Sequence, residues 1–485
     1  MSKLANLHSI FLGRILLITI QAASFSVAQT APVSPDYPWH AAAELQIQAD
    51  TKQLSDKRFN LDQGKSYSLT DLIDLAETHN PDTRVAWELA RGQAAALGIA
   101  RSELYPTLAA VALSQVSRSE AYLATRFSRQ TIGDFGTALE LNYLIFDFGG
   151  RSGRIDAAKA RTLASNFGFN DTHRKVIYDV QRAYYQLLTA TGQEEAARAS
   201  LSNAQTVQQA AEERLKNGLA TLPDVLEARS ATAQADYELQ AVLGQEEIAR
   251  GNLATALGAS PTTSIRIQPL TELTIPESIA DTVEQAIDRA LASRPDLLDQ
   301  VALVRAGRAV VKQARAEFYP SLTFSGGPIA QSLYGSQQTS PWGHTAGLNG
   351  SLTINLNWTV FDGGARKNRL AEAKADLHAT EAQVHVLRDQ VADQVWTAYS
   401  NLSTAFRQRQ AAIALLEATS QSYAAALEAY KYGVRNLLDV TAAQRTLAQA
   451  RSTDVTARTQ VLASLADLAF RTADSIQPSV RKSTP

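Results

Sequence analysis

Residues 145–160 read IFDFGGRSGRIDAAKA, and residues 360–375 read VFDGGARKNRLAEAKA. In each stretch an apolar pair precedes an Asp and a Gly-rich turn, and two Arg residues follow three positions apart. Alternating apolar sequence precedes both stretches and a long helical pattern follows them, so they predict the same strand-to-helix joint twice. We assign the joint, which glycine allows to turn sharply, to Asp147, Gly149, Gly150, Asp362, Gly363 and Gly364.

The joint belongs to a duplication that covers most of the chain. Pro-Asp at 81–82 recurs at 295–296, and Tyr-Pro at 105–106 recurs at 319–320. The joint itself and a turn beginning at Gly218 recur 215 residues later. Ordered landmarks at spacings of 214 and then 215 residues indicate two copies of one unit. We place these units at residues 68–260 and 281–473, with a linker at 261–280.

Both halves predict the same order of elements. A short helix precedes a medium helix, which begins at a proline in its first turn and ends before Tyr-Pro. Two strands, a long helix, a Gly turn and a last helix follow. The predicted ranges are strands over about 107–147 and 321–361, long helices over about 151–216 and 366–431, and last helices over about 222–257 and 437–472.

The strands are the most informative part of each half. Leu352, Ile354 and Leu356 alternate with polar residues, which predicts a strand with one apolar and one polar face. About ten such residues suit a strand that crosses a bilayer, although a strand of a soluble sandwich is the alternative for each segment alone. Between the paired strands we expect long loops at about 117–136 and 326–349.

The long helices carry matched apolar stripes. Their spacings of 4, 3 and 4 residues repeat every 11, which is typical of nearly straight helix packing. The positions are Val176, Val180, Ala183 and Leu187 in the first half and Val391, Val395, Ala398 and Leu402 in the second. An ordinary coiled coil explains the helices but not the strands between them. The predicted fold is therefore mainly α with a membrane β part.

Composition and the N-terminus limit the class of protein. The formal net charge is −2 and Cys is absent, which excludes disulfides, thiolate metal sites and a lipid anchor on cysteine. An apolar run after Arg14 and small residues at Ser26 and Ala28 predict a signal peptide over residues 1–28. We expect an extended segment over 29–67 and a polar tail over 474–485.

Four membrane strands in one chain impose a requirement for more chains. Four strands cannot close into a barrel, and open strand edges are not tolerated in hydrocarbon. Two chains give eight strands, which leave little interior space, and three give twelve. Polar inward positions such as Asn355 and Asn357 favour a wet lumen and thus three chains.

This ordered set of landmarks resembles the TolC-like outer membrane factor (outer membrane efflux protein) family over about residues 68–473. The resemblance implies a trimer whose 12-stranded outer-membrane barrel continues into a long periplasmic α-helical barrel. It implies the exit duct of a tripartite efflux or type I secretion system, with a periplasmic adaptor protein and an inner-membrane pump as partners. It implies no enzyme activity, no cofactor and no metal site. In agreement with this, the sequence contains no Gly-x-Ser-x-Gly and no His-Glu-x-x-His motif.

The resemblance also implies functional residues at the periplasmic turns. Tyr430 and Arg435 match family residues that hold the tip closed by bonding to an acid, here Asp224, within or between subunits. Asp439 matches a carboxylate that forms a threefold ring at the pore constriction. The adaptor-docking turns correspond to Gly218, Leu219, Ala220, Thr221, Leu222, Gly433, Val434, Asn436 and Leu437.

Two alternatives remain open from the sequence. Asp224 and Asp439 stand where an acid caps a helix start, a role that needs no pore. Ala442 replaces a second acid of the family pattern, so a double acidic ring is not expected. The competing function is a structural or adhesive periplasmic coiled-coil protein. The cargo, whether drug, metal, polypeptide or siderophore, is not encoded in these motifs.

Overall fold

A computed structural model describes residue 36 and residues 44–55, 65–123, 126–270, 275–276, 282–337 and 340–474. Residues 1–59 and 60–485 form two units, and each is described by itself. In the first unit, helix α2 (Glu44–Ser55) replaces part of the extended segment expected over 29–67. Its sequence contains three Gln and two Leu and lacks Gly and Pro, which favours a helix. The predicted signal peptide lies outside the described residues.

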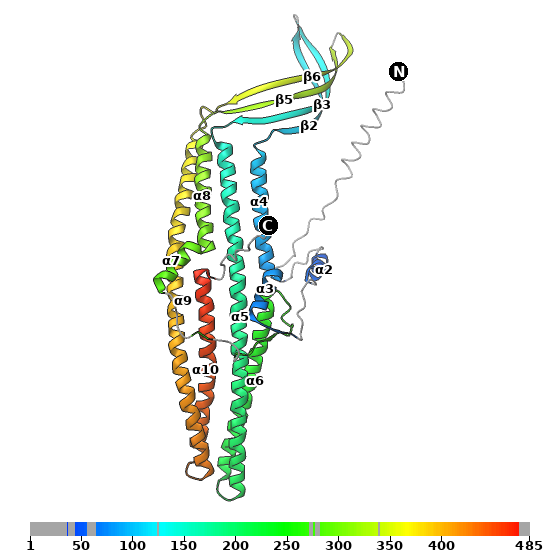
Figure 1. Ribbon diagram of the computed structural model, residues 1–485. Helices are drawn as coiled ribbons and strands as arrows, with labels where there is room; N and C mark the ends of the chain where they lie inside the picture. The colour runs from blue at the N-terminus through cyan, green and yellow to red at the C-terminus, as the bar shows by residue number, and fades with distance from the viewer. Residues whose placement is uncertain are drawn as a thin grey trace, which may run out of the picture. The chain divides into compact units, whose positions relative to one another are not determined.

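The second unit contains the duplicated order of elements (Figure 1). The first copy consists of α3 (Leu69–His79), α4 (Pro81–Ser102), β2 (Thr107–Leu123), β3 (Arg126–Phe146), α5 (Gly150–Lys216) and α6 (Leu222–Ala256). The second consists of α7 (Val283–Ser293), α8 (Pro295–Ala316), β5 (Ser321–Gln337), β6 (Ser340–Asn357), α9 (Ala365–Lys431) and α10 (Leu437–Thr472). A short parallel pair joins β1 (Ser66–Tyr67) to β4 (Arg266–Ile267).

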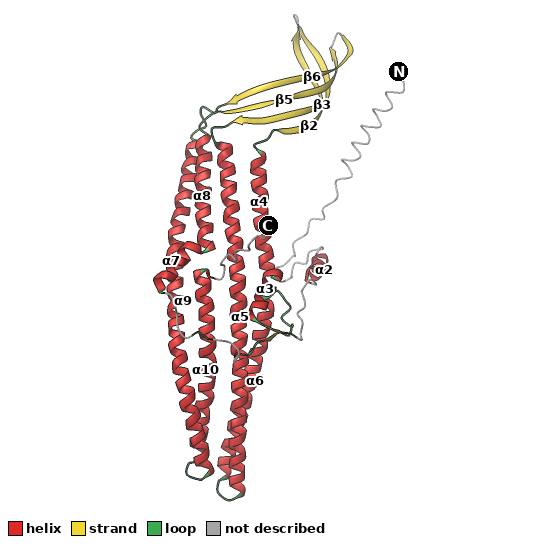
Figure 2. Ribbon diagram, in the orientation of Figure 1, coloured by secondary structure: helices red, strands yellow, loops and turns green. Residues whose placement is uncertain are grey.

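One antiparallel sheet contains the four long strands in the order β2-β3-β5-β6 (Figure 2). The central contact joins β3 to β5, so the two copies of the repeat meet in the middle of the sheet. β2 and β6 are its outer strands, and within the part of the chain that the structure describes each has one unpaired edge.

The loops predicted at about 117–136 and 326–349 are wrong. The described residues of both stretches, which leave out 124–125 and 338–339, belong to strands, because β2 pairs with β3 from Thr107↔Asn142 to Leu123↔Arg126, and β5 pairs with β6 from Ser321↔Asn357 to Gln337↔Ser340. Their polar residues and glycines predict loops, whereas the hydrogen bonds of the ladder are made by backbone groups. Glycine even suits this sheet locally, since a Cβ on Gly327 would lie 1.8 Å from the Leu139 carbonyl oxygen.

The second predicted strand pair also ends earlier than its range of about 321–361. β6 ends at Asn357, whereas β3 continues to Phe146 at the corresponding joint. The last residues of β3 pair with β5, from Tyr143↔Phe324 to Phe146↔Leu322. Residues 358–361 have no partner strand among the described residues of one chain, so they stay outside the ladder.

Two helices of 67 residues each, α5 and α9, run the length of the helical part. At about 1.5 Å per residue each is about 100 Å long. All eight predicted stripe positions are buried, between 0% and 6% exposed. α5 packs against α4, α6, α8 and α10, and α9 packs against α7, α8 and α10. No helix among the described residues is long and apolar enough to cross a membrane.

The two medium helices occupy different environments although their sequences correspond. α8 lies between α5 and α9 and buries nine residues, whereas α4 packs along α5 and buries none. α4 and α8 have the same length and equivalent positions in the repeat. They differ in burial because α9 covers one face of α8, and no described helix of the chain covers the corresponding face of α4.

Candidate functional site at the helical turns and the strand-to-helix joints

The α5–α6 and α9–α10 turns lie together at the end of the helices remote from the sheet (Figure 1). Gly218 and Gly433 adopt φ of 71° and 78°, the left-handed conformation that ends a helix at low cost for glycine. Large apolar side chains are exposed on both turns, among them Leu219 (65%), Leu222 (59%) and Val434 (78%). Exposed apolar residues at one end indicate a surface for a partner.

Asp224 is engaged within its own helix start. Its carboxylate accepts hydrogen bonds from the Thr221 backbone N–H at 2.8 Å and from the Thr221 hydroxyl at 2.7 Å. These bonds, with a smaller contribution from the charge of Arg214, lower the pKa of Asp224 below its usual range. Within one chain, Asp224 therefore caps the start of α6, which is the alternative role that the sequence leaves open.

Asp439 occupies the matching position in the second half with a different set of contacts. The side chain of Asn436 caps α10 by accepting a hydrogen bond from the Asp439 backbone N–H at 2.9 Å. Among the described residues, no side chain donates to the Asp439 carboxylate or forms an ion pair with it. The capping role thus passes to Asn436, and the charge of Asp439 stays available for another role.

Tyr430 is buried, with 3% of its surface exposed. It lies in an apolar cluster contributed by both helical hairpins, α5–α6 and α9–α10. Its hydroxyl is shielded from solvent and has no hydrogen-bond partner in the described part of the chain. Burial raises the pKa of Tyr430, which the charge of Arg214 partly offsets. The expected bond from Tyr430 to Asp224 is not formed within one chain.

Arg435 is exposed on the α9–α10 turn, and its side chain has no bond to Asp224 within the described chain. The structure therefore brings the turns together but does not join Tyr430, Arg435 and Asp224 inside one subunit. Contacts of these residues between subunits stay a prediction.

Sequence reasoning missed Arg214 in the last turn of α5. Its guanidinium donates to the carbonyl oxygens of Tyr430 at 2.6 Å, Lys431 at 3.3 Å and Leu219 at 3.1 Å. It also lies over the Tyr430 ring, 4.8 Å from the centroid. A cation near a helix C-terminus was the only available signal, and it does not indicate which second helix is reached.

The joints at the other end of the helices use the arginines of the duplicated motif. Arg151 donates to the Glu103 and Leu144 carbonyl oxygens at 3.1 and 2.8 Å, and Arg154 pairs with the Glu103 carboxylate at 2.6 Å. In the second copy Arg366 and Arg369 make the corresponding contacts with the carbonyl and the carboxylate of Glu317. Each pair connects the start of a long helix to the end of the preceding medium helix.

The backbone of each joint has two consecutive left-handed residues. Gly149 and Gly364 have φ of 99° and 91°, and they are preceded by Phe148 at 52° and Gly363 at 67°. Asp147 accepts a hydrogen bond from the Arg151 backbone N–H, and Asp362 accepts from that of Arg366 at 3.0 Å. The Asp residues thus cap the long helices, while Gly allows the turn.

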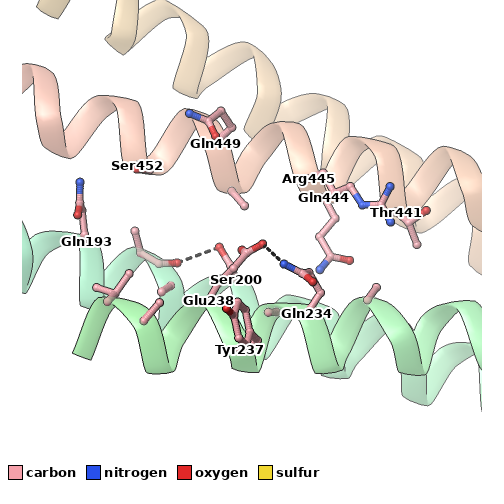
Figure 3. A pocket seen from close by; sticks show the side chains of 17 residues that line it. Gln193, Ser200, Gln234, Tyr237, Glu238, Thr441, Gln444, Arg445, Gln449 and Ser452 are labelled. Carbon is pink, nitrogen blue, oxygen red and sulfur yellow. Dashed lines mark hydrogen bonds between the residues drawn. The ribbon is translucent and has the colours of Figure 1, made fainter. Parts of the chain in front are cut away.

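A groove of about 530 Å³ lies between α5, α6 and α10 (Figure 3). Its lining is mostly small and polar, and Gln234 donates to Glu238 at 2.8 Å across one turn of α6. The described residues contain no group of three or more His, Asp or Glu side chains placed to hold a metal ion. The groove lies between the α5–α6 and α9–α10 hairpins, on the side of their turns that faces the sheet.

The comparisons with known proteins agree with this geometry. The sequence pattern of the outer membrane efflux proteins matches residues 72–259 and 286–473, one match per repeat. Protein CyaE of Bordetella pertussis is 29% identical over 404 residues, which cover 82% of this chain and 83% of that protein. Outer membrane protein OprJ of Pseudomonas aeruginosa is 27% identical and covers 89% and 88%.

Solved structures show the same fold. A membrane protein from Pseudomonas aeruginosa superposes with a TM-score of 0.73 at 25% identity, covering 91% of this chain and all of that one. The outer-membrane channel OprN superposes with the same TM-score at 22% identity, covering 91% and 98%. With the family pattern matched in both halves, the chain belongs to the outer membrane efflux protein family, whose members are TolC-like channels.

Proposed function

We propose that the chain is one of three identical subunits of a passive exit duct. The four long strands of each chain would close into a 12-stranded barrel in the outer membrane. The long helices would continue it as a tube through the periplasm. The observation that carries the proposal is the sheet itself, because β2 and β6 each leave one edge without a partner among the described strands. Such edges require partner strands in hydrocarbon.

The surface of β6 supports a membrane location for the sheet. Leu352, Ile354 and Leu356 are 77%, 66% and 68% exposed and alternate with polar residues along the strand. An outer strand with a continuous exposed apolar face is typical of lipid contact and is an aggregation hazard in water. The polar face would then line the lumen.

The uncovered side of α4 supports the same assembly among the helices. In one chain α8 is enclosed by α5 and α9, and α4 has only α5 on the corresponding side. Since the two halves repeat one unit, α9 of the next subunit is the natural neighbour for α4. The unpaired edges of the sheet and the uncovered face of α4 therefore support the same ring of three subunits.

The turns form the periplasmic end of this duct. We assign adaptor docking to the exposed apolar residues of the α5–α6 and α9–α10 turns. Asp439, which has no side-chain partner among the described contacts, would contribute to a threefold carboxylate ring that attracts cations and repels anions. Arg435, which is exposed, would hold the closed state through contacts with the neighbouring subunit, and the buried Tyr430 would support its turn from within the chain.

The duct performs no reaction, and an inner-membrane pump would supply the energy through a periplasmic adaptor. A relative at 25% identity is the pyoverdine export outer membrane protein OpmQ of Pseudomonas aeruginosa, and another at 24% is a toluene efflux pump component, TtgC, of Pseudomonas putida. Relatives with such different cargo support a general duct whose selectivity resides in the pump.

Conductance of the purified protein in a planar bilayer tests the duct. We expect heat-resistant trimers from outer-membrane fractions, with small conductance at rest and larger conductance after Arg435→Ala. Trimers that never conduct, in the parent and in Arg435→Ala, would instead support the structural coiled-coil function. Water-soluble monomers after export would contradict both the barrel and the duct.

A further inference from the structure

The apolar face of the four-stranded sheet contains a row of aromatic side chains that crosses three strands. Phe324 pairs with Ile354 on this face, and side chains alternate between the two faces along each strand. Tyr334 and His344 each lie ten residues from that pair, so they share the face, and their ring centroids are 4.3 Å apart. The ring of Phe135 in β3 lies edge-on to that of Tyr334 at 5.9 Å. We call Phe135, Tyr334 and His344 the distal aromatic row, because it is remote from the helices.

A second aromatic group lies at the joints, at the opposite end of the strands. Phe146 contacts Phe148 with ring centroids 4.7 Å apart, and Phe148 stacks on Tyr319 at 5.0 Å. Phe146 follows Phe135 by eleven residues in β3, which is about 36 Å along a strand at about 3.3 Å per residue. With the tilt of about 45° of a membrane strand, the two aromatic groups stand about 26 Å apart across the bilayer. This agrees with an apolar band of about 25 Å between two aromatic girdles.

Charged side chains are distributed unequally between the two faces of the sheet. The pairing of β2 with β3 is regular over the whole described ladder, so the register assigns each residue to a face. Among the charged side chains that the structure describes there, Arg118, Glu120 and Arg129 lie on the apolar face, beyond the distal aromatic row. Asp134 and Glu140 lie on the polar face. The cations therefore stand on the side exposed to lipid, just outside the apolar band.

Arg118 is the more available of these two arginines. It is exposed, and the described part of the chain gives it no ion pair. It pairs across the ladder with Thr131, four residues beyond Phe135, so its Cα stands about 9 Å outside the distal aromatic row at the same rise and tilt. Its long side chain can extend back towards the membrane surface. Arg129 pairs with Glu120 at 3.5 Å, but both side chains are more than half exposed and the pair is weak.

A further aromatic pair lies beyond the arginines, at the end of the β2–β3 hairpin. Tyr122 and Phe127 are 64% and 70% exposed, and their rings meet edge-on at 5.2 Å. The arginines thus lie between two aromatic groups. Guanidinium groups bind phosphate through charge-assisted hydrogen bonds, and aromatic rings offer flat faces on which sugar rings pack. A phosphorylated sugar head group presents both of these chemistries.

We propose that Arg118 and Arg129 bind the phosphate groups of lipid A, the phosphorylated glucosamine disaccharide lipid of the outer leaflet, with the distal aromatic row at the boundary of its acyl chains. The inference rests on the proposed function, because it requires a membrane barrel whose strand hairpins face outward. Charge complementarity supports this occupant, since an anionic head group meets the face that holds the described arginines. In a trimer the contact recurs three times and fixes the height of the barrel in the membrane.

Native mass spectrometry of the purified trimer in detergent tests the contact by counting bound lipids. The protein is titrated with bisphosphorylated lipid A, with monophosphorylated lipid A and with phosphatidylethanolamine. We expect bisphosphorylated lipid A to bind most tightly and the monophosphorylated form to be weaker. Arg118→Ala should bind bisphosphorylated lipid A about tenfold more weakly, as expected for the loss of one hydrogen bond to a charged group. Equal affinity for the three lipids, or an unchanged affinity in Arg118→Ala, would overturn the proposal.

Arg118→Ser/Ser117→Arg is the matched control, because it moves the cation by one residue without changing the composition. Adjacent residues of a strand point to opposite faces, so the new arginine lies on the polar face. The double variant should bind lipid A as weakly as Arg118→Ala. Binding equal to that of the parent would show that the face carrying the arginine is irrelevant, which contradicts the contact.

Glu120→Gln tests the sign of the charge effect. Glu120 repels phosphate and engages Arg129, so its neutralisation should tighten the binding of bisphosphorylated lipid A. Weaker binding in Glu120→Gln would oppose a contact based on the two arginines.

Conductance separates the failure of this contact from that of the duct. Arg118→Ala should remain a trimer and conduct like the parent in a planar bilayer. A conducting parent without preference for lipid A overturns the contact alone. If trimers do not conduct but lose lipid A with Arg118→Ala, the duct fails and the lipid contact stands. Water-soluble monomers would overturn both.

Discussion

Asp224 and Asp439 occupy matching positions in the two repeats, yet their side chains have different roles. Thr221 precedes α6, and its backbone and hydroxyl both donate to Asp224. Asn436 precedes α10 and accepts a bond itself, from the backbone of Asp439. Because an amide oxygen caps the second helix, the second carboxylate is not needed for that purpose. A single difference in the capping residue thus releases one charge per chain.

Asp224→Asn is expected to make the tip insensitive to acid. The carboxylate pKa lies below its ordinary 3.8 because the folded state bonds the ionised form. The stabilisation that ionised Asp224 gives to the folded turn is therefore complete above pH 3.8, and it is lost as the pH falls through the lowered pKa. Conductance of the parent should rise in that acid range. Asp224→Asn, which loses about 0.3–1 kcal/mol of charge–dipole stabilisation, should conduct more at neutral pH and lack the acid step.

Asp156→Asn serves as the control for this titration. Asp156 pairs with Lys312 on an exposed part of α5 near the joints. An acid step that persists in Asp224→Asn and disappears in Asp156→Asn would show that another carboxylate controls the tip.

Arg214 marks the limit of prediction from sequence. Capping acids can be predicted because a cap and its helix are adjacent in the chain. Arg214 instead binds backbone carbonyls more than 200 residues away, and carbonyl groups leave no pattern in the sequence. Only the packed hairpins reveal which helix end the cation reaches.

Among the elements, the helices were predictable and the strands only partly so. Helix α5 begins at Gly150 and α9 at Ala365, within one residue of the predicted starts, because Asp, Gly and the 11-residue stripe are local signals. Strand extent depends on a partner strand. The polar residues of β2 and β3 therefore predict a loop, although the backbones of the two strands pair from Thr107↔Asn142 to Leu123↔Arg126.

Gly153→Ala is expected to destabilise the contact between α5 and α8. A Cβ at this position would lie 2.9 Å from the Gln313 nitrogen and 3.0 Å from the Ala309 oxygen, both backbone atoms that cannot move aside. Overpacking of this kind costs about 1–3 kcal/mol. The midpoint of thermal loss of helical circular dichroism should fall accordingly.

Gly92→Ala in α4 is the matched control, because no heavy atom lies within 4 Å of its added Cβ in one chain. Alanine is favoured over glycine inside a helix by about 1 kcal/mol, so the control should not lower the midpoint. If Gly153→Ala melts with the parent, the two helices are farther apart than the structure has them.

For the whole molecule, the repeat that relates the two halves of the chain also predicts how one chain meets the next. Within a chain, the end of β3 pairs with the start of β5, for example Leu144↔Thr323. Thr359 corresponds to Leu144, and Ala109 corresponds to Thr323, by the spacings of the joint and of Tyr-Pro. Thr359 of one chain should therefore pair with Ala109 of its neighbour.

This register can be tested directly because the chain has no native cysteine. The double variant Thr359→Cys/Ala109→Cys should give disulfide-linked dimers and trimers on a non-reducing denaturing gel. Thr359→Cys/Ala110→Cys should not, since a shift of one residue places the second thiol on the opposite face of the sheet. Equal linkage in both variants, or links confined to monomers, would contradict the extension of the repeat across subunits. The expected result would also explain why residues 358–361 remain outside β6 in a single chain: their partner strand belongs to the next one.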